Sequence, residues 1–278
     1  MGETVLAVKD LVVEARDRKR VIPLLRGLSF HVDEGECLGI LGESGSGKSL
    51  TAQAVMGLLD GNFRVAGEAW FGGRNLLRES AENLRRLRGS RIAMVLQNPM
   101  TAFDPLCRVS EQIGETFRAH TDWPADKIHA ESLRLLERMH IRDPEESLRK
   151  YPHQLSGGML QRIMIGLALA LEPELVIADE PTTALDAITQ FEVLTAFREL
   201  KRQQRAAMIF ITHDLGAVSF MADRILVMNH GKIVDEGTFA EILQGAKDPY
   251  TRLLIEKKTA VMRKYREVMG KGERDAAA

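Results

Sequence analysis

The sequence has few cysteines and aromatic residues, and it lacks a long apolar run. Its 278 residues include only two cysteines, Cys37 and Cys107, which lie far apart and form no CxxC pair. This spacing argues against a disulfide framework, a zinc finger or an iron–sulfur site, and it fits a reducing cytosol. No stretch approaches the roughly 20 apolar residues that a membrane-spanning helix needs, and segment 1–10 shows no secretory signal pattern. The sequence therefore predicts that any membrane role depends on a partner.

The chain also has almost no net charge. It contains 38 Lys and Arg against 39 Asp and Glu, so the formal net charge is -1. A chain with balanced charge provides no overall positive potential to attract a nucleic-acid backbone, so nucleic acid is not an expected partner. Hydrophobic residues at 45% and charged residues at 28% are typical of globular proteins. The length suits one large α/β domain with an inserted or appended subdomain.

Short apolar runs bounded by polar turns recur along the chain and predict buried strands. Helical patterns lie between the later runs, so the crossover rule predicts a mostly parallel core sheet. Residues from about 104 show helical periodicity without a convincing strand, which indicates a helical insert. From Phe239 onward the pattern predicts one or two more helices. The predicted strands are 5–8, 28–32, 37–41, 92–96, 175–178, 207–211 and 225–228.

A glycine-rich segment follows the apolar run 37–41 and precedes a helical pattern. It fits G-x-x-x-x-G-K-[ST], whose glycines let backbone N–H groups turn inward around a polyphosphate. The N-terminus of the following helix adds positive potential. Lys48 is expected to neutralise the β- and γ-phosphates, and the Ser49 hydroxyl is expected to hold Mg²⁺. The predicted ATP-binding residues are Gly42, Glu43, Ser44, Gly45, Ser46, Gly47, Lys48, Ser49 and Leu50.

Two carboxylates end the apolar run 175–178, at the edge of the sheet where open α/β folds place their ligands. Asp179 is expected to orient Mg²⁺, and Glu180 to polarise the hydrolytic water as general base. A strand that ends in a solvated acidic turn is the alternative for this pair taken alone.

A third element is Ser156-Gly157-Gly158, which opens a helical pattern with serine as its cap. Such a helix start exposes N–H groups and is a second candidate anion site, although taken alone it is an ordinary capped helix.

Taken in their order along the chain, these segments and the other motifs given below resemble an ATP-binding cassette (ABC) ATPase over about residues 4–240. The resemblance implies a P-loop (RecA-like) α/β cassette with a mostly parallel core sheet, an N-terminal antiparallel β subdomain and an α-helical insert at about 104–165. It places the ATPase domain at 1–240 and a C-terminal helical tail at 241–278. The motifs that carry it are the phosphate loop, Gln97, LSGGMLQR at 155–162, LVIADEPT at 175–182, Ala184-Leu185-Asp186 and Thr212-His213-Asp214.

The resemblance also implies roles for single residues in a head-to-tail dimer of cassettes. Ser156, Gly157, Gly158 and Gln161 form the signature segment, which acts on ATP held by the partner. Asp186 communicates across the dimer, and His213 contacts the γ-phosphate. Gln97 senses the metal and the water and joins Ser49 and Asp179 in holding Mg²⁺.

Flanking segments narrow the resemblance to the peptide and nickel importers. QNPMTAFDPL at 97–106, YPHQ at 151–154 and DPYT at 248–251 are similar to that group, while GKSLT, MLQR and IADEPTT look closest to nickel and metallophore-metal import ATPases. The expected partners are a second, related ATPase subunit, two membrane permeases and an extracytoplasmic substrate-binding protein, with this chain at the cytoplasmic face of the inner membrane. Import of an oligopeptide or dipeptide is the alternative. A soluble ABC ATPase and a non-hydrolysing accessory cassette are the other classes considered.

One residue departs from the family pattern. Members carry an aromatic side chain in the first hairpin that stacks on adenine, and the aligned residue here is Ala15. Because stacking contributes on the order of 1 kcal/mol, its loss should loosen nucleotide binding without removing phosphate chemistry.

Overall fold

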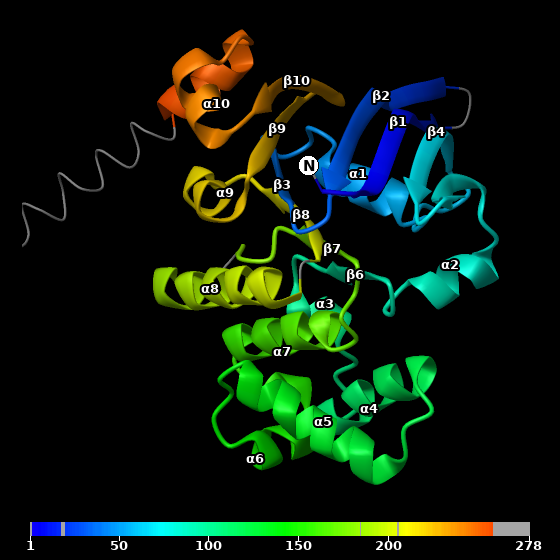
Figure 1. Ribbon diagram of the computed structural model, residues 1–278, viewed down its shortest axis with the longest axis vertical. Coiled ribbons are helices and arrows are strands. Elements are labelled where there is room, and N and C mark those ends of the chain that lie inside the picture. Colours follow the sequence, from blue (N-terminus) through cyan, green and yellow to red (C-terminus); the bar gives the residue numbers. More distant parts are fainter. Residues whose placement is uncertain (1, 18–19, 184, 205, 258–278) are drawn as a thin grey trace, which may run out of the picture.

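A computed structural model describes residues 2–17, 20–183, 185–204 and 206–257 of the chain (Figure 1). The predicted helical tail at 241–278 is therefore described only as far as residue 257, where it forms α10 (Phe239–Gly245) and a further helix at 249–257. The remainder of that prediction lies outside the described residues. None of the described helices combines the length and the apolar character that crossing a bilayer would require.

The core sheet has six strands in the order β10-β9-β3-β8-β7-β6. All neighbouring pairs are parallel except β9 and β10, so the predicted mostly parallel sheet is confirmed. Every residue of β3, β7 and β8 is buried, which explains their continuous apolar sequences. The strands are β3 (Cys37–Leu41), β6 (Ile92–Val95), β7 (Leu175–Asp179), β8 (Ala207–Thr212), β9 (Arg224–Asn229) and β10 (Lys232–Gly237).

A second, antiparallel sheet packs on the first and has the order β2-β1-β4-β5. Its strands are β1 (Thr4–Asp17), β2 (Arg20–Asp33), β4 (Phe63–Phe71) and β5 (Arg74–Asn75). Leu6, Leu11 and Leu25 from this sheet share one hydrophobic core with Ile40 of β3 and Val55 of α1 (Lys48–Val55). The two sheets therefore enclose α1, the helix that follows the phosphate loop (Figure 1).

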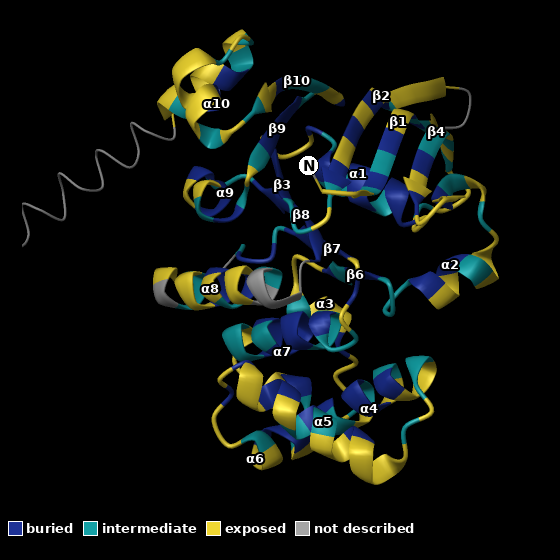
Figure 2. Cartoon of the chain, in the orientation of Figure 1, coloured by how far each residue is buried: buried dark blue, intermediate teal, exposed yellow. Residues whose placement is uncertain are grey.

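A helical lobe lies on the other side of the core sheet (Figure 1). It contains α4 (Val109–His120), α5 (Ala125–Arg138) and α6 (Pro144–Arg149), packed against α7 (Gly157–Leu169). Buried faces of these helices meet in the lobe while their exposed faces point outward (Figure 2). The other helices are α2 (Ala81–Leu87), α3 (Pro99–Ala102), α8 (Ala187–Gln204), α9 (Leu215–Met221), η1 (Leu76–Arg78) and η2 (Pro152–Gln154).

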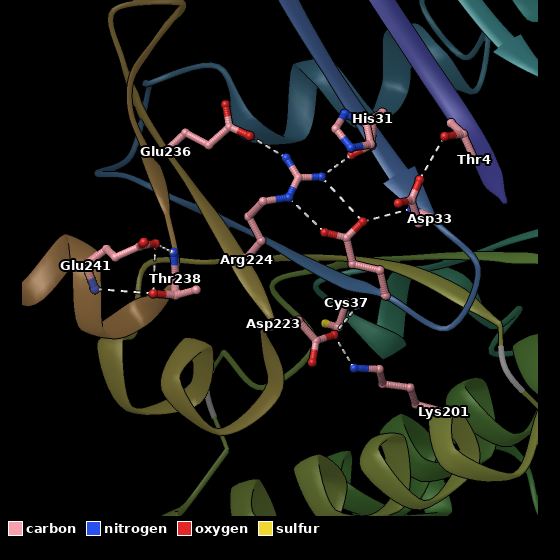
Figure 3. Close-up of polar contacts among 11 residues, drawn as sticks. Thr4, His31, Asp33, Cys37, Lys201, Asp223, Arg224, Glu236, Thr238 and Glu241 are labelled. Atoms are coloured by element: carbon pink, nitrogen blue, oxygen red, sulfur yellow. Dashed lines mark hydrogen bonds and ion pairs between the residues drawn. The ribbon is translucent and has the colours of Figure 1, made fainter. Parts of the chain in front are cut away.

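Polar contacts tie the start of β3 to the start of β9 (Figure 3). The Arg224 guanidinium donates to Glu36 Oε1 over 2.8 Å and to the His31 carbonyl over 2.7 Å, and it also pairs with Glu236. The carboxylate of Asp223 accepts from the Cys37 backbone N–H over 2.7 Å and from Lys201. These contacts anchor the end of the sheet opposite the phosphate loop.

The two cysteines lie in different surroundings. Burial raises the pKa of the Cys37 thiol to about 12, and this residue is fully buried in β3. Cys107 is partly exposed in the loop after α3, where desolvation and the Asp104 carboxylate raise the pKa of its thiol. Both thiols are free.

Candidate functional site

Four loops meet at the carboxyl ends of the parallel strands. The phosphate loop follows β3, Gln97 lies just after β6, Asp179 and Glu180 end β7, and His213 follows β8. These strands are neighbours in the order β3-β8-β7-β6, so residues distant in sequence come together at one sheet edge. They surround a cavity of about 620 Å³, whose lining is Leu24, Gly42, Glu43, Ser44, Gly45, Gly47, Lys48, Ser49, Leu50, Gln97, Glu180, Thr183, His213 and Leu254.

The phosphate loop turns sharply into α1. Gly47 has φ 105°, a left-handed conformation that favours glycine, and a Cβ there would lie 2.6 Å from Leu25 Cδ2. Gly47 is also the N-cap of α1 and supplies no side-chain cap. The first N–H groups of the helix are therefore suited to an anion.

Lys48 lies at the bottom of the cavity with only 4% of its side chain exposed. Its ammonium donates to the Gly42 carbonyl over 2.9 Å and to the Glu43 carbonyl over 3.0 Å. Burial lowers the pKa of Lys48, and the negative charges of Glu180 and Asp179 oppose that shift. The two carboxylates favour the charged ammonium, and burial has the larger effect on the pKa of this group.

Glu180 is the centre of the polar contacts in the cavity. Its Oε2 atom accepts from the Thr183 hydroxyl over 2.8 Å and from Gln97 Nε2 over 3.2 Å, and it lies 3.2 Å from His213 Nδ1. Its Oε1 atom faces Lys48 Nζ at 3.8 Å. The backbone of Glu180 has φ 45°, which is uncommon outside glycine and costs on the order of 1 kcal/mol. The turn after β7 thus aims this carboxylate into the cavity.

Asp179 and Ser49 bring two oxygen groups together beside Lys48. Ser49 Oγ donates to Asp179 Oδ1 over 2.8 Å. Burial raises the pKa of Asp179, and the Ser49 hydrogen bond opposes the shift. Hydroxyl, carboxylate and amide oxygens are the ligands that Mg²⁺ prefers, so Ser49, Asp179 and Gln97 suit that ion. The Ser46 hydroxyl is buried without a hydrogen-bond partner among the described residues, as expected of a loop that takes an anion.

The signature segment lies apart from this cavity. Ser156 caps α7 by accepting from the Met159 backbone N–H over 3.2 Å, and Ser156 and Gly157 are exposed. A Cβ on Gly158 would lie 2.7 Å from Thr189 Cγ2, so α7 approaches the start of α8 closely. There Asp186 Oδ2 accepts from the Thr189 hydroxyl over 2.6 Å. The segment at 156–158 therefore faces outward, next to Asp186.

Gln161 was expected to act with the signature segment, and only 1% of it is exposed in the single chain. It lies on the buried face of α7 with Leu160, Ile163 and Met164. Its action on a partner's ATP stays a prediction.

Sequence reasoning missed several residues of the cavity. The Thr183 hydroxyl donates to Glu180, and Thr183 lies at the end of the motif IADEPTT. Its closeness in sequence to Asp179 and Glu180 could have indicated that it belongs to the site. Leu24 and Leu254 come from β2 and from the C-terminal helix, and no motif marks them. Ala15 lies in β1 opposite Ile22 and Phe63, one strand away from Leu24.

A model of the family "ABC transporter" matches residues 25–183, more than half of the chain. The chain is 42% identical over 266 residues to the metal-staphylopine import system ATP-binding protein CntD of Staphylococcus aureus, covering 96% of this chain and 97% of that protein. It is 43% identical over 249 residues to the oligopeptide transport ATP-binding protein OppD of Bacillus subtilis, covering 88% of this chain and 69% of OppD.

Solved structures agree on the fold. The dimeric ATP-binding cassette MJ0796 bound to ADP and Pi superposes with a TM-score of 0.76, at 24% identity, over 84% of this chain and 98% of that one. The sequence prediction of an ABC cassette is confirmed by the family match and by the relatives. The chain belongs to the ABC transporter family and is one of its ATP-hydrolysing cassettes.

Proposed function

We propose that the chain powers import of nickel or another transition metal, either free or bound to a metallophore. The observation that carries the proposal is 42% identity to a metal-staphylopine import ATPase over 96% of the chain. Import of an oligopeptide is the second candidate, because a peptide-import relative is 43% identical over 88% of the chain. Both candidates use the same hydrolytic site and differ in the membrane partners that select the solute.

In this proposal the phosphates of ATP lie along residues 42–50. Lys48 neutralises the β- and γ-phosphates from its position beside the carbonyls of Gly42 and Glu43. Glu180 accepts the proton of the attacking water, since its carboxylate faces the cavity and is held by Gln97 and Thr183. His213, whose Nδ1 lies 3.2 Å from Glu180 Oε2, contacts the γ-phosphate.

Mg²⁺ is the proposed metal cofactor, held by Ser49, Gln97 and Asp179. When bound, the ion neutralises charge on the phosphates and polarises their oxygens. The Ser49–Asp179 contact at 2.8 Å supports this assignment, because both oxygens already lie next to the phosphate loop.

A second cassette completes the site in this proposal. Ser156, Gly157 and Gly158 bind the γ-phosphate held by the partner, and Asp186 carries the state of one site to the other. The exposed N-terminus of α7 and its close contact with Thr189 next to Asp186 support these roles. The ATPase domain then comprises 1–240 with its helical insert, and 241–278 is an appended segment. The partner cassette is a related chain, and two membrane permeases and an extracytoplasmic binding protein complete the importer. This chain lies at the cytoplasmic face of the inner membrane, attached through the permeases.

Uptake by a strain that lacks this chain tests the solute. Accumulation of labelled nickel, of a labelled metal–metallophore complex and of a labelled dipeptide is compared with the parent strain. Wild-type chain and the exposed-surface control Lys9→Ala should restore metal uptake, whereas Lys48→Ala should not. Loss of dipeptide uptake alone would favour the second candidate. Unchanged uptake of all three solutes would contradict both.

A further inference from the structure

The C-terminal helix at 249–257 contacts the phosphate loop, which lies about 200 residues earlier in the chain. We propose that Tyr250 is a positioning residue for ATP binding, which holds the Gly42–Glu43 peptide and through it the binding position of Lys48. This inference rests on the proposed ATP site and concerns how that site is kept in shape.

The contact between Tyr250 and the loop is a hydrogen bond to a single peptide unit. The Glu43 backbone N–H donates to the Tyr250 hydroxyl over 2.8 Å. The carbonyl of the same peptide unit belongs to Gly42 and accepts from Lys48 Nζ over 2.9 Å. A trans peptide is planar, so its N–H and C=O point in opposite directions and rotate together. Tyr250 and Lys48 therefore hold one peptide plane from its two sides.

Two more residues of the helix reach the same part of the cavity. Leu254 lines the cavity and is only 3% exposed, and Lys257 Nζ lies 3.8 Å from Glu43 Oε1. Residues 250, 254 and 257 have the spacing of one helix face. The Lys257–Glu43 pair is exposed and contributes little by itself, because solvent screens it. The pair shows that the helix face with residues 250, 254 and 257 meets the loop.

The helix at 249–257 is fixed to the core sheet, so it can hold the phosphate loop in a defined position relative to that sheet. Asp235 of β10 accepts from the Lys247 and Asp248 backbone N–H groups, each over 3.0 Å. Asp248 Oδ1 in turn accepts from the Tyr250 N–H over 2.8 Å at the start of the helix. Leu254 packs in one hydrophobic cluster with Leu41, the residue that precedes the phosphate loop. The helix and the loop are thus attached to the same rigid elements.

Loss of the Tyr250 hydroxyl should weaken ATP binding more than it slows hydrolysis. The unpaired Glu43 N–H would let the peptide plane turn, and the carbonyl that orients Lys48 would turn with it. Glu180 is held by Gln97, Thr183 and His213 and has no contact with Tyr250, so the chemical step should be spared. One hydrogen bond of this kind corresponds to roughly a threefold to tenfold change in affinity.

The test compares full-length wild-type chain, Tyr250→Phe and the control Glu256→Gln, which changes an exposed residue of the same helix. Mg²⁺–ATP binding is measured by calorimetry, and KM and kcat are measured on the assembled transporter. We expect Tyr250→Phe to raise Kd and KM by about three- to tenfold with kcat within about twofold, while Glu256→Gln matches wild type. A Kd for Tyr250→Phe within twofold of wild type, in a variant of unchanged Tm, would overturn the proposal.

Amide hydrogen exchange gives a local readout, because the β3 amides of the same chain report any change in overall stability. In the wild-type chain the Glu43 amide should be protected, and in Tyr250→Phe its exchange should accelerate by about tenfold while the β3 amides stay unchanged. Exchange of the wild-type Glu43 amide at the rate of an unstructured peptide would also overturn the proposal. Failure of wild-type chain to bind ATP would instead refute the proposed function, so the two failures are distinguishable.

Discussion

Replacement of Glu180 by glutamine should separate ATP binding from hydrolysis. Glutamine keeps the size of the side chain and can still accept the Thr183 hydrogen bond of 2.8 Å through its amide oxygen. It loses the carboxylate that would take a proton from water. A positioned general base contributes about 10²- to 10⁴-fold, or roughly 3–5 kcal/mol of the barrier.

The structural cost of Glu180→Gln is smaller than this catalytic loss. Glu180 is largely buried, and the amide gives up the charge next to Lys48 and the contact of one oxygen with Gln97 or His213. A lost hydrogen bond of this type costs about 1 kcal/mol, which corresponds to roughly a fivefold change in ATP affinity. Binding should therefore persist while turnover falls by at least a hundredfold.

Phosphate release at saturating Mg²⁺–ATP measures turnover, and a fluorescent ATP analogue measures binding in the same preparations. Because ATP would remain bound without being hydrolysed, we expect a closed dimer to accumulate, which size-exclusion chromatography can detect. Glu172→Gln is the matched control, since it removes an exposed carboxylate shortly before the same strand. If Glu180→Gln turned over within tenfold of wild type, the assignment of this carboxylate as the base would be refuted.

Three further predictions concern other parts of the site. Ser156→Asp keeps the cap of α7 but adds a negative charge beside the γ-phosphate held by the partner. In mixed dimers in which only one phosphate loop is intact, this variant should slow hydrolysis at the partner's loop at least tenfold relative to Ser156→Asn. A loss of hydrolysis confined to the variant's own loop would contradict the trans arrangement. Burial raises the pKa of Asp179, so above that pKa its charged form lowers the free energy of unfolding. Asp179→Asn should therefore raise the Tm of the nucleotide-free chain at pH 7, by about 2–4 °C for each kcal/mol gained in the free energy of unfolding, as measured by scanning calorimetry. In wild type, Mg²⁺-supported ATP binding should weaken as pH falls toward that raised pKa, and this Mg²⁺ effect should be absent from the asparagine variant. Ala15→Tyr should tighten ATP binding several-fold through stacking on adenine, at about 1 kcal/mol, and an unchanged Kd would sink this idea.

The central strands β3, β7 and β8 of the core sheet were predictable because burial on both faces leaves a continuous apolar sequence. The run Cys37–Leu41 matches β3 at both ends, and the runs at 175–178 and 207–211 fall one residue short of β7 and β8. Each of those strands ends on a polar residue, Asp179 or Thr212, which the apolar pattern excludes although its side chain is buried. An apolar pattern therefore misses strand residues whose side chains are polar but buried.

Other elements gave no such signal. β4 and β10 mix apolar residues with charged residues and glycine in no regular pattern, and neither was predicted as a strand. Helix α1 ends at Val55, although apolar residues at helical spacing continue through Leu58 and Leu59, so the pattern alone does not mark the end of this helix. The contact of Tyr250 with the phosphate loop spans |i−j| = 207, and local patterns contain no information about pairs at that separation.

The unequal surroundings of the two cysteines provide a natural reporter for the loop after Gln97. The thiolate is the nucleophile that attacks a thiol-reactive fluorophore, so the fully buried Cys37 with its pKa of about 12 should remain unmodified in the folded chain. Cys107 is the other cysteine of the sequence and is accessible, although its raised pKa calls for mildly alkaline labelling. A single dye can therefore be attached between the helical lobe and the hydrolytic site without removing any native residue. Its emission would follow, in real time, how far that loop moves when nucleotide arrives and departs.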